Sequence, residues 1–135
     1  MENLSQFELE LTEKAKQVAA NSYSPYSKFP VGSAVIDESG NVYTGCNVEN
    51  ASLGLSVCAE RNAVFSAVSQ VGKGLRIKLV AIFTPTSKPT TPCGACRQVL
   101  QEFADNLKII CTCNGDEHFV GTLNELFNHP PEIEW

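Results

Sequence analysis

Three cysteines at two helix starts constrain how this chain can fold. Cys58 directly precedes a stretch with helical periodicity, and Cys93 and Cys96 open another such stretch later in the chain. A Cys-x-x-Cys pair at a helix start can bind one metal ion from a single turn, and a thiolate from a second helix start adds a third ligand. The sequence therefore predicts a fold that brings these two helix starts together around one metal ion.

Three protein ligands would leave one corner of a tetrahedral metal site open. This is the arrangement of catalytic zinc sites, where water takes the fourth position, whereas structural sites use four protein ligands. Zinc with three thiolates carries a net charge of about −1, which the positive ends of the two helices offset. We expect Arg61 to donate hydrogen bonds to the thiolates and to offset this charge further, with Arg97 as a second candidate.

Glu60 follows the first predicted ligand by two residues, so it should lie near the metal without binding it. A carboxylate there can take a proton from activated water and pass it to a ring nitrogen and to a leaving amine. Zinc deaminases divide the work in this way and carry a ligand-x-Glu segment followed by Pro-Cys-x-x-Cys. We therefore predict Glu60 as the catalytic residue and Cys58, Cys93 and Cys96 as the zinc ligands.

Four segments of the chain closely resemble the small, homotetrameric cytidine deaminases, a zinc-dependent family. The similarity runs from about residue 23 to residue 126 and is carried by Phe29-Pro30-Val31-Gly32, Gly45-Cys46-Asn47-Val48-Glu49-Asn50-Ala51, Cys58-Ala59-Glu60-Arg61 and Pro92-Cys93-Gly94-Ala95-Cys96-Arg97-Gln98. The resemblance implies one zinc ion per chain and a homotetramer or dimer. The implied reaction is hydrolytic deamination of free cytidine or deoxycytidine to the uracil nucleoside and ammonia, a step of pyrimidine salvage.

The resemblance also implies a set of substrate-binding residues. Phe29 corresponds to the family aromatic that packs on the base, and the backbone amide of Ala59 to the group that reads the base carbonyl. Asn47 and Glu49 correspond to the pair that hydrogen-bonds the sugar 3'-hydroxyl. Such a pair rejects ligands without the hydroxyl, because its own polar groups would stay unpaired.

Two positions depart from the family pattern, and both bear on substrate choice. Many relatives carry Tyr where this chain has Leu53, and a Phe after the last short helix where this chain has Asn128-His129-Pro130-Pro131. Trp135 is a candidate replacement for that Phe. The blasticidin-S deaminases, which resemble the chain in the same zinc motifs, therefore stay open as an alternative, as do deaminases of other aminopyrimidines or modified nucleosides.

Another alternative is a zinc-stabilised interaction module without catalysis. A structural site would need a fourth ligand from Cys46, Cys111 or Cys113, and Glu60 would have no task in it. These three cysteines lie on strand patterns and are expected to be small buried hydrophobes. A redox Cys-x-x-Cys pair is less favoured, since it gives no role to Pro92 or to Cys58-Ala59-Glu60.

Charge and composition exclude several kinds of partner. The chain has a net charge of −5 and ten scattered Lys and Arg residues, so nucleic-acid polymers are not expected to bind. It has no apolar run of membrane-spanning length, and the acidic residues at its start do not resemble a targeting segment. We expect a cytoplasmic protein with a small-molecule nucleoside substrate and without disulfides.

The order of the predicted elements favours one α/β domain over residues 1–135. Helices alternate with strands in a way that predicts a mixed five-stranded sheet between helices, a three-layer α-β-α sandwich of the cytidine deaminase-like kind. The predicted helices span residues 5–20, 59–71, 94–104 and 123–127, and the predicted strands span 31–36, 42–48, 77–83, 108–112 and 118–120.

Overall fold

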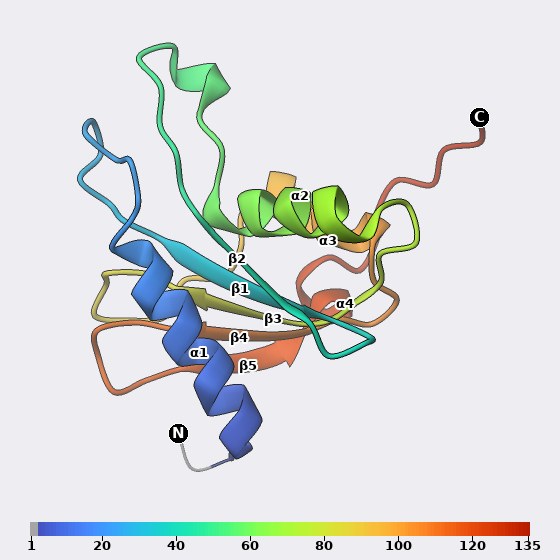
Figure 1. Ribbon diagram of the computed structural model, residues 1–135, viewed down its shortest axis with the longest axis horizontal. Coiled ribbons are helices and arrows are strands. Elements are labelled where there is room, and N and C mark those ends of the chain that lie inside the picture. Colours follow the sequence, from blue (N-terminus) through green and yellow to red (C-terminus); the bar gives the residue numbers. More distant parts are fainter. Residues whose placement is uncertain (1–2) are drawn as a thin grey trace.

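The computed structural model describes residues 3–135 and contains one mixed sheet flanked by helices (Figure 1). The strands lie in the order β2-β1-β3-β4-β5; β3 and β4 run parallel and the other neighbours run antiparallel. The predicted α/β fold with a mixed five-stranded sheet is confirmed. Its elements are α1 (Gln6–Ala19), β1 (Gly32–Asp37), β2 (Val42–Cys46), the 3-10 turn η1 (Leu53–Leu55), α2 (Ala59–Val71), β3 (Ile77–Phe83), α3 (Gly94–Glu102), β4 (Lys108–Thr112), β5 (Phe119–Thr122) and α4 (Leu123–Leu126).

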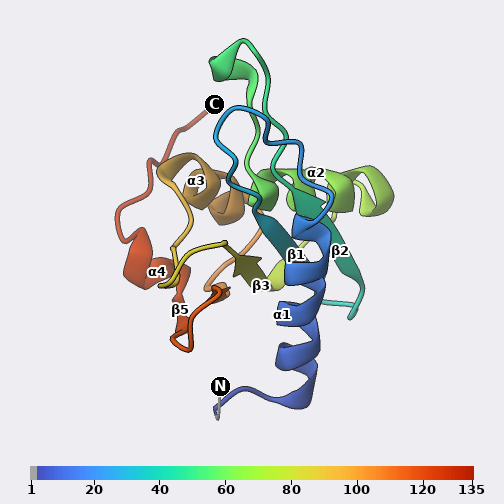
Figure 2. The same cartoon turned by 90° about the vertical axis from the view of Figure 1, so that its left-hand side faces the viewer.

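Helices cover both faces of the sheet (Figures 1 and 2). On one face α1 buries Leu11 and Ala15 against Ile36 and Leu79. On the other face α2, α3 and α4 bury a second core that includes Val64, Leu100, Leu123, Val80 and Ile109. Strand β3 contributes to both cores, which explains why its sequence is an almost unbroken apolar run.

Two glycines let helices pack directly on the strands. A Cβ at Gly32 of β1 would lie 1.8 Å from the backbone oxygen of Ala15, and one at Gly45 of β2 would lie 2.3 Å from the backbone nitrogen of Ala63. No larger residue fits at either position, because real Cβ atoms do not approach so closely. The Gly45 contact sets the height of α2 above the sheet and therefore the place of Cys58, the N-cap residue of α2.

The second strand ends earlier than the sequence predicts. It stops at Cys46, opposite the first residue of β1, and Val48 pairs instead with Tyr23 and Val57 in isolated bridges. Residues 22–30 and 47–57 therefore form two adjacent loops at one end of the sheet (Figure 1). The last strand is also shifted, to Phe119–Thr122. Within residues 3–135, no helix combines the length and apolarity needed to cross a membrane.

Candidate active site

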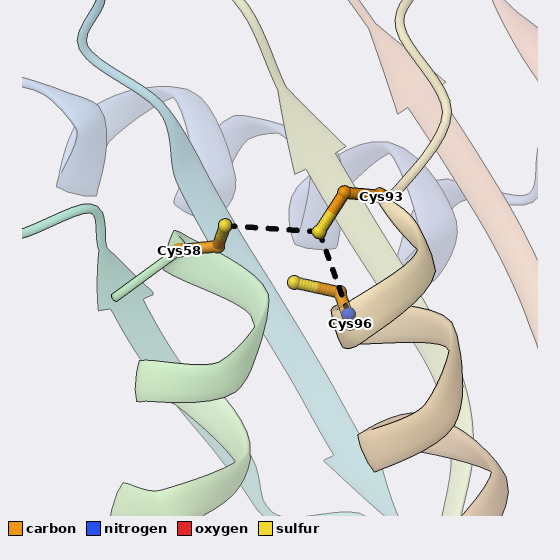
Figure 3. Close-up of side chains that lie close together, drawn as sticks. All are labelled: Cys58, Cys93 and Cys96. Atoms are coloured by element: carbon orange, nitrogen blue, oxygen red, sulfur yellow. Dashed lines mark hydrogen bonds between the residues drawn. The ribbon is translucent and has the colours of Figure 1, made fainter. Parts of the chain in front are cut away.

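The three cysteines predicted as ligands meet at the N-termini of α2 and α3 (Figure 3). Their sulfur atoms all lie within 4.8 Å of one another. Cys58 and Cys93 are the N-cap residues of the two helices, with 3.9 Å between their Sγ atoms. Cys93 Sγ also accepts a hydrogen bond from the backbone N–H of Cys96 at 3.5 Å. The fold thus brings the two helix starts together, as the sequence predicts.

The spacing of the sulfur atoms fits a tetrahedral zinc ion. All three cysteines are free, and a disulfide would need about 2.05 Å between two sulfurs. Thiolates that bind zinc at about 2.3 Å on a tetrahedron lie about 3.8 Å apart, close to the 3.9 Å observed for Cys58 and Cys93. Among residues 3–135, no other cysteine, histidine or carboxylate joins the cluster, so the protein supplies three ligands.

The remaining cysteines lie outside this cluster. Cys111 is buried, and burial raises the pKa of its thiol to about 12, as expected of a small apolar side chain. Cys46 and Cys113 are only half-buried, and Cys113 lies just beyond the end of β4. Their expected burial is therefore incomplete, and none of the three is placed to complete a four-sulfur structural site.

Two hydrogen-bond donors, one of them positively charged, stabilise the thiolate form of Cys58. Hydrogen bonds from the Cys96 thiol and from the Arg61 guanidinium lower the pKa of Cys58 to about 5. The Arg61 contact joins Nη2 to Cys58 Sγ at 3.4 Å. The hydrogen bond to Cys58 and burial raise the pKa of Cys96. Arg61 thus touches a thiolate, whereas Arg97, the second candidate, donates to the Pro92 and Leu126 carbonyls and to the Thr91 hydroxyl.

Glu60 is a buried carboxyl beside the three sulfurs but outside the group they form. It is the second residue of α2 and only 5% exposed. Burial raises its pKa, and the negative charge on Cys58 raises it further. A carboxyl with this environment, next to a metal centre and facing a cavity, is suited to accept and release a proton.

A cavity of about 370 Å³ opens beside the cysteines. This volume lies in the range of small-molecule sites. Its wall includes every residue for which the sequence predicts a substrate contact, together with the catalytic candidate and two of the ligands: Phe29, Asn47, Glu49, Ala59, Glu60, Cys58 and Cys93. Six further residues line the cavity without having been predicted as site residues, and of these only Val31 belongs to a segment that carries the family resemblance: Ser27, Val31, Ile82, Thr84, Thr90 and Thr91.

Glu49 and Asn47 both hydrogen-bond the neighbouring loop. Glu49 Oε1 accepts from the backbone N–H groups of Tyr26 at 3.0 Å and Ser27 at 3.2 Å. A side-chain hydrogen bond from Ser27 is the main cause that lowers the pKa of Glu49. Asn47 Nδ2 donates to the Phe29 carbonyl at 2.8 Å, and Asn47 Oδ1 accepts from the Val31 N–H at 2.9 Å. These contacts join the two loops along one wall of the cavity.

The two positions that depart from the family pattern lie on the surface. Leu53 begins the turn η1 and is 72% exposed. Residues 128–135 form no regular element, and Trp135 is fully exposed. Neither Leu53 nor Trp135 lines the cavity of this chain.

Comparison with known proteins places the chain in a family. Residues 5–113 match the "Cytidine and deoxycytidylate deaminase zinc-binding region". The chain is 47% identical over 96 residues to a cytidine deaminase of Sporosarcina psychrophila, which covers 70% of this chain and 68% of that protein. A crystal structure of cytidine deaminase from Burkholderia pseudomallei is similar with a TM-score of 0.82 and 39% identity, over 91% of this chain and 96% of that one.

A blasticidin-S deaminase of Bacillus cereus is also similar, at 31% identity over 120 residues and 84% of each chain. The chain belongs to the cytidine and deoxycytidylate deaminase family. Because the matched region contains Cys58, Cys93 and Cys96, the metal of this centre is zinc.

Proposed function

We propose that this protein hydrolyses free cytidine and deoxycytidine to uridine and deoxyuridine, with release of ammonia. One observation carries the proposal. The same cavity is lined at one place by zinc ligands and a buried carboxyl, Cys58, Cys93 and Glu60, and elsewhere by an aromatic ring and a second carboxylate, Phe29 and Glu49. A nucleoside needs both: proton-transfer groups at the base and hydrogen-bonding groups at the sugar.

Glu60 handles the protons of the reaction. Cys58, Cys93 and Cys96 would hold the zinc ion, which when bound supplies Lewis-acid activation of water at neutral pH. Glu60 takes one proton from the attacking water and delivers it to the ring nitrogen next to the reacting carbon. It then takes the second proton of that water from the newly added hydroxyl and gives it to the leaving amine, so that the carbonyl forms as the carbon–nitrogen bond breaks. The balance is one water and one cytidine consumed, and one uridine and one ammonia formed. Burial of Glu60 keeps bulk water from competing for these protons.

Two groups are placed to orient the base. Ala59 is the first residue of α2, so its backbone N–H has no acceptor within the helix and is free to donate to the base carbonyl. Phe29 lines the cavity and can stack on the base. Both residues lie on walls that also present Glu60 or Cys58, which would set the reacting carbon beside the metal centre.

The sugar end favours an unphosphorylated substrate. Glu49 lines the cavity and its lowered pKa keeps it ionised at neutral pH. A carboxylate accepts a hydrogen bond from a sugar hydroxyl but repels a phosphate. The net charge of −5 acts in the same direction. We therefore propose a nucleoside, rather than a nucleotide or a polynucleotide, as the substrate.

The decisive test is the ultraviolet absorbance change when zinc-loaded protein meets cytidine, with ammonia assayed in parallel. Conversion to uridine with an equal amount of ammonia is the expected result. No conversion by protein that holds one zinc per chain would overturn the cytidine proposal and move the substrate to another aminopyrimidine.

Blasticidin S is the second candidate substrate. It is favoured by the similarity to the Bacillus cereus blasticidin-S deaminase and by Leu53, which departs from the family pattern near the loops that border the cavity. A panel of cytidine, deoxycytidine and blasticidin S separates the two. We expect kcat/KM to be highest for the nucleosides; turnover of blasticidin S faster by orders of magnitude would reverse the assignment.

X-ray absorption at the zinc edge tests the non-enzymatic alternative. The three-cysteine cluster predicts three sulfur ligands and one lighter ligand. Four sulfur ligands would indicate a structural zinc site and would contradict the enzyme proposal.

We also propose that the protein assembles into a homotetramer or dimer in the cytoplasm. Exposed apolar side chains of η1 and α2, namely Leu53, Leu55 and Phe65, support self-association. The six free cysteines suit a reducing compartment. Sedimentation velocity on the full chain tests the assembly, and a monomer at micromolar concentration would contradict it.

A further inference from the structure

Thr84 is a buried polar residue in the wall of the cavity, and the following loop determines how its hydroxyl can bind. We propose that Thr84 is a specificity-determining residue, a hydrogen-bond acceptor at the C5 edge of the base. It favours a C5 substituent that carries a donor over an apolar substituent of similar size. This inference rests on the proposed nucleoside substrate and deepens it.

Strand β3 carries Thr84 to the side of the sheet on which the metal centre lies. Side chains alternate between the two faces of a strand. Ile82 packs in the core beneath α2 and α3, and Phe83 packs in the core beneath α1. Thr84 continues the ladder just beyond β3, since its N–H donates to the Thr112 carbonyl at 3.1 Å. It therefore shares the face of Ile82, is only 3% exposed, and lines the cavity together with Ile82.

The proton of the Thr84 hydroxyl is already used within the protein. A hydroxyl has one O–H donor and two acceptor lone pairs. The Thr86 hydroxyl donates its proton to the Lys88 carbonyl at 2.6 Å, so it can only accept in its 2.8 Å hydrogen bond with the Thr84 hydroxyl. Thr84 is therefore the donor in that bond and keeps only lone pairs for a ligand. Among residues 3–135, no other hydrogen bond reaches its Oγ1.

The proposed binding mode turns the C5 edge of the base away from α2. The Ala59 N–H binds the base carbonyl, while Glu60 serves the ring nitrogen and the amine. Both residues belong to the first turn of α2. The carbonyl, this nitrogen and the amine form one edge of the ring, and C5 and C6 form the opposite edge. The C5 edge therefore faces lining residues that come from other elements.

The wall that remains for the C5 edge comes from the end of β3 and from the loop before α3. In the proposed mode Phe29 stacks on the base and Glu49 lies at the sugar end. The lining residues of β3 and of the loop include Ile82, Thr84 and Thr90. Of these three, Ile82 is apolar and Thr90 is exposed. Thr84 thus supplies the buried polar group of this wall.

A buried acceptor without a donor selects for ligands that supply one. Cytidine carries only hydrogen at C5, and an ethyl group there would cover Thr84 without pairing its lone pairs. A hydroxymethyl group of nearly the same size can donate to Thr84 Oγ1. Because a buried polar group that stays unpaired carries a desolvation cost, this wall discriminates between the two substituents by hydrogen bonding rather than by size.

The test compares cytidine, 5-ethylcytidine and 5-hydroxymethylcytidine on the zinc-loaded wild type, Thr84→Val and Thr84→Ser. In Thr84→Val, which keeps the shape but not the hydroxyl, we expect the kcat/KM ratio of the hydroxymethyl to the ethyl substrate to fall about 5- to 50-fold. Thr84→Ser should keep this ratio within about threefold of the wild-type value. Comparing ratios between variants removes the intrinsic reactivity of each base. A merely structural role would lower kcat/KM on all three substrates alike.

Thr86→Val supplies a second arm, because Thr86 accepts the Thr84 proton but does not line the cavity. Its loss leaves Thr84 free to donate. We therefore expect 5-methoxycytidine, whose substituent can only accept, to gain about three- to tenfold in kcat/KM relative to 5-ethylcytidine. Ser87→Ala is the matched control, since Ser87 is an exposed residue of the same loop outside the cavity, and its substrate ratios should equal those of the wild type. If Thr84→Val does not fold, this pair decides.

Three results would overturn the inference. The first is a Thr84→Val protein whose hydroxymethyl-to-ethyl ratio stays within about threefold of the wild-type ratio. The second is a Thr86→Val protein with an unchanged methoxy-to-ethyl ratio. The third is a wild type that converts cytidine but no C5-substituted cytidine, because the wall would then leave no room for a substituent. A wild type that does not convert cytidine would instead overturn the proposed function, and the inference with it.

Discussion

The Arg61 guanidinium donates a hydrogen bond to the sulfur of Cys58, three residues before it in the chain, at 3.4 Å between Nη2 and Sγ. The contact places a permanent positive charge beside a centre where three thiolates outweigh the charge of one zinc ion. Together with the hydrogen bond from the Cys96 thiol, which has the larger effect, it lowers the pKa of Cys58 and so favours the thiolate that binds the metal. Arg61 therefore changes the charge at the metal centre without being one of the metal ligands.

Replacement of this guanidinium tests that role. For Arg61→Gln we expect zinc affinity or kcat/KM to fall about 10- to 100-fold, the usual range for a partner that orients a metal ligand. Arg61→Lys keeps the positive charge but loses the planar guanidinium, so its zinc affinity and kcat/KM should lie between those of the wild type and of Arg61→Gln. Chelator competition measures the zinc affinity, and a cytidine assay measures turnover. If Arg61→Gln equals the wild type in both measurements, Arg61 has no role at the metal centre.

Glu60→Gln separates the catalytic carboxyl from the ligands. Because Glu60 does not belong to the sulfur cluster, zinc content should stay near one ion per chain. Loss of the proton-transfer group should lower kcat by about 10²- to 10⁴-fold. Metal analysis and a cytidine assay on the same sample give both numbers. Loss of zinc from the variant would mean that Glu60 is a ligand and that its assigned role is wrong.

The zinc cluster and the central layers of the fold could be predicted because local chemistry determines them. The segments Ala59–Val71, Ile77–Phe83 and Lys108–Thr112 were predicted with the bounds that the structure has. Their apolar periodicity and the glycine that ends α2 are local signals. The three ligand cysteines could likewise be predicted from the sequence, because three thiols at two helix starts are typical of a metal site.

The surroundings of Asn47 could not be predicted in the same way. Strand β2 ends at Cys46 because the next residues bind the loop of residues 22–30 rather than β1. No periodicity connects Ser22, Phe29 and Val31 with Asn47, and their hydrogen bonds exist only once the loops meet. The threonines that line the cavity are missed for the same reason, because Thr84, Thr90 and Thr91 belong to a loop without a motif.

Asp37 gives the fold a component of acid sensitivity. It lies at the end of β1 and is 5% exposed. Burial alone would raise its pKa, but hydrogen bonds from the Asn41 N–H, the Tyr43 hydroxyl and the Ser39 N–H outweigh burial and lower it below 3.8. A depressed folded-state pKa stabilises the protein above the unfolded pKa, and this contribution is lost as the pH falls through the folded value.

Asp37→Asn should therefore cost about 1–2 kcal/mol of unfolding free energy at pH 7. The difference from the wild type should stay constant down to about pH 5 and shrink below about pH 4, where the carboxyl of the unfolded chain begins to be protonated, until the pH has passed the lower pKa of the folded state. Urea denaturation at pH 7, 5, 4 and 3 measures it, with the exposed neighbour changed in Glu38→Gln as the control. A difference that persists undiminished at pH 3 would show that the charge of Asp37 is not its cause.

Arg97 connects residues 91–92, the segment before the zinc ligand Cys93 that we call the metal loop, to the end of α4. Its replacement should weaken the packing of both segments. The guanidinium donates to the Pro92 carbonyl at 2.7 Å, to the Leu126 carbonyl at 2.8 Å and to the Thr91 hydroxyl at 3.2 Å. Hydrogen bonds from a charged donor contribute about 1.5–3 kcal/mol each when they are sheltered. The Arg97 side chain is half-buried, so its hydrogen bonds are only partly sheltered. We expect Arg97→Gln to lower the free energy of unfolding by about 2–4 kcal/mol in total, and Arg97→Lys by nearly as much.

The matched control is Arg76→Gln. Arg76 also donates to a backbone carbonyl, that of Glu102, but its ion pair is with Asp105, whose side chain is 96% exposed. Such a pair contributes about 0–1 kcal/mol. Urea denaturation of zinc-loaded protein compares the two variants, and zinc release by a chelator should be faster only in Arg97→Gln, because Pro92 adjoins the ligand Cys93. If the Arg97→Gln and Arg76→Gln proteins are equally stable and release zinc at equal rates, the hydrogen bonds of Arg97 between α4 and the metal loop do not stabilise the fold.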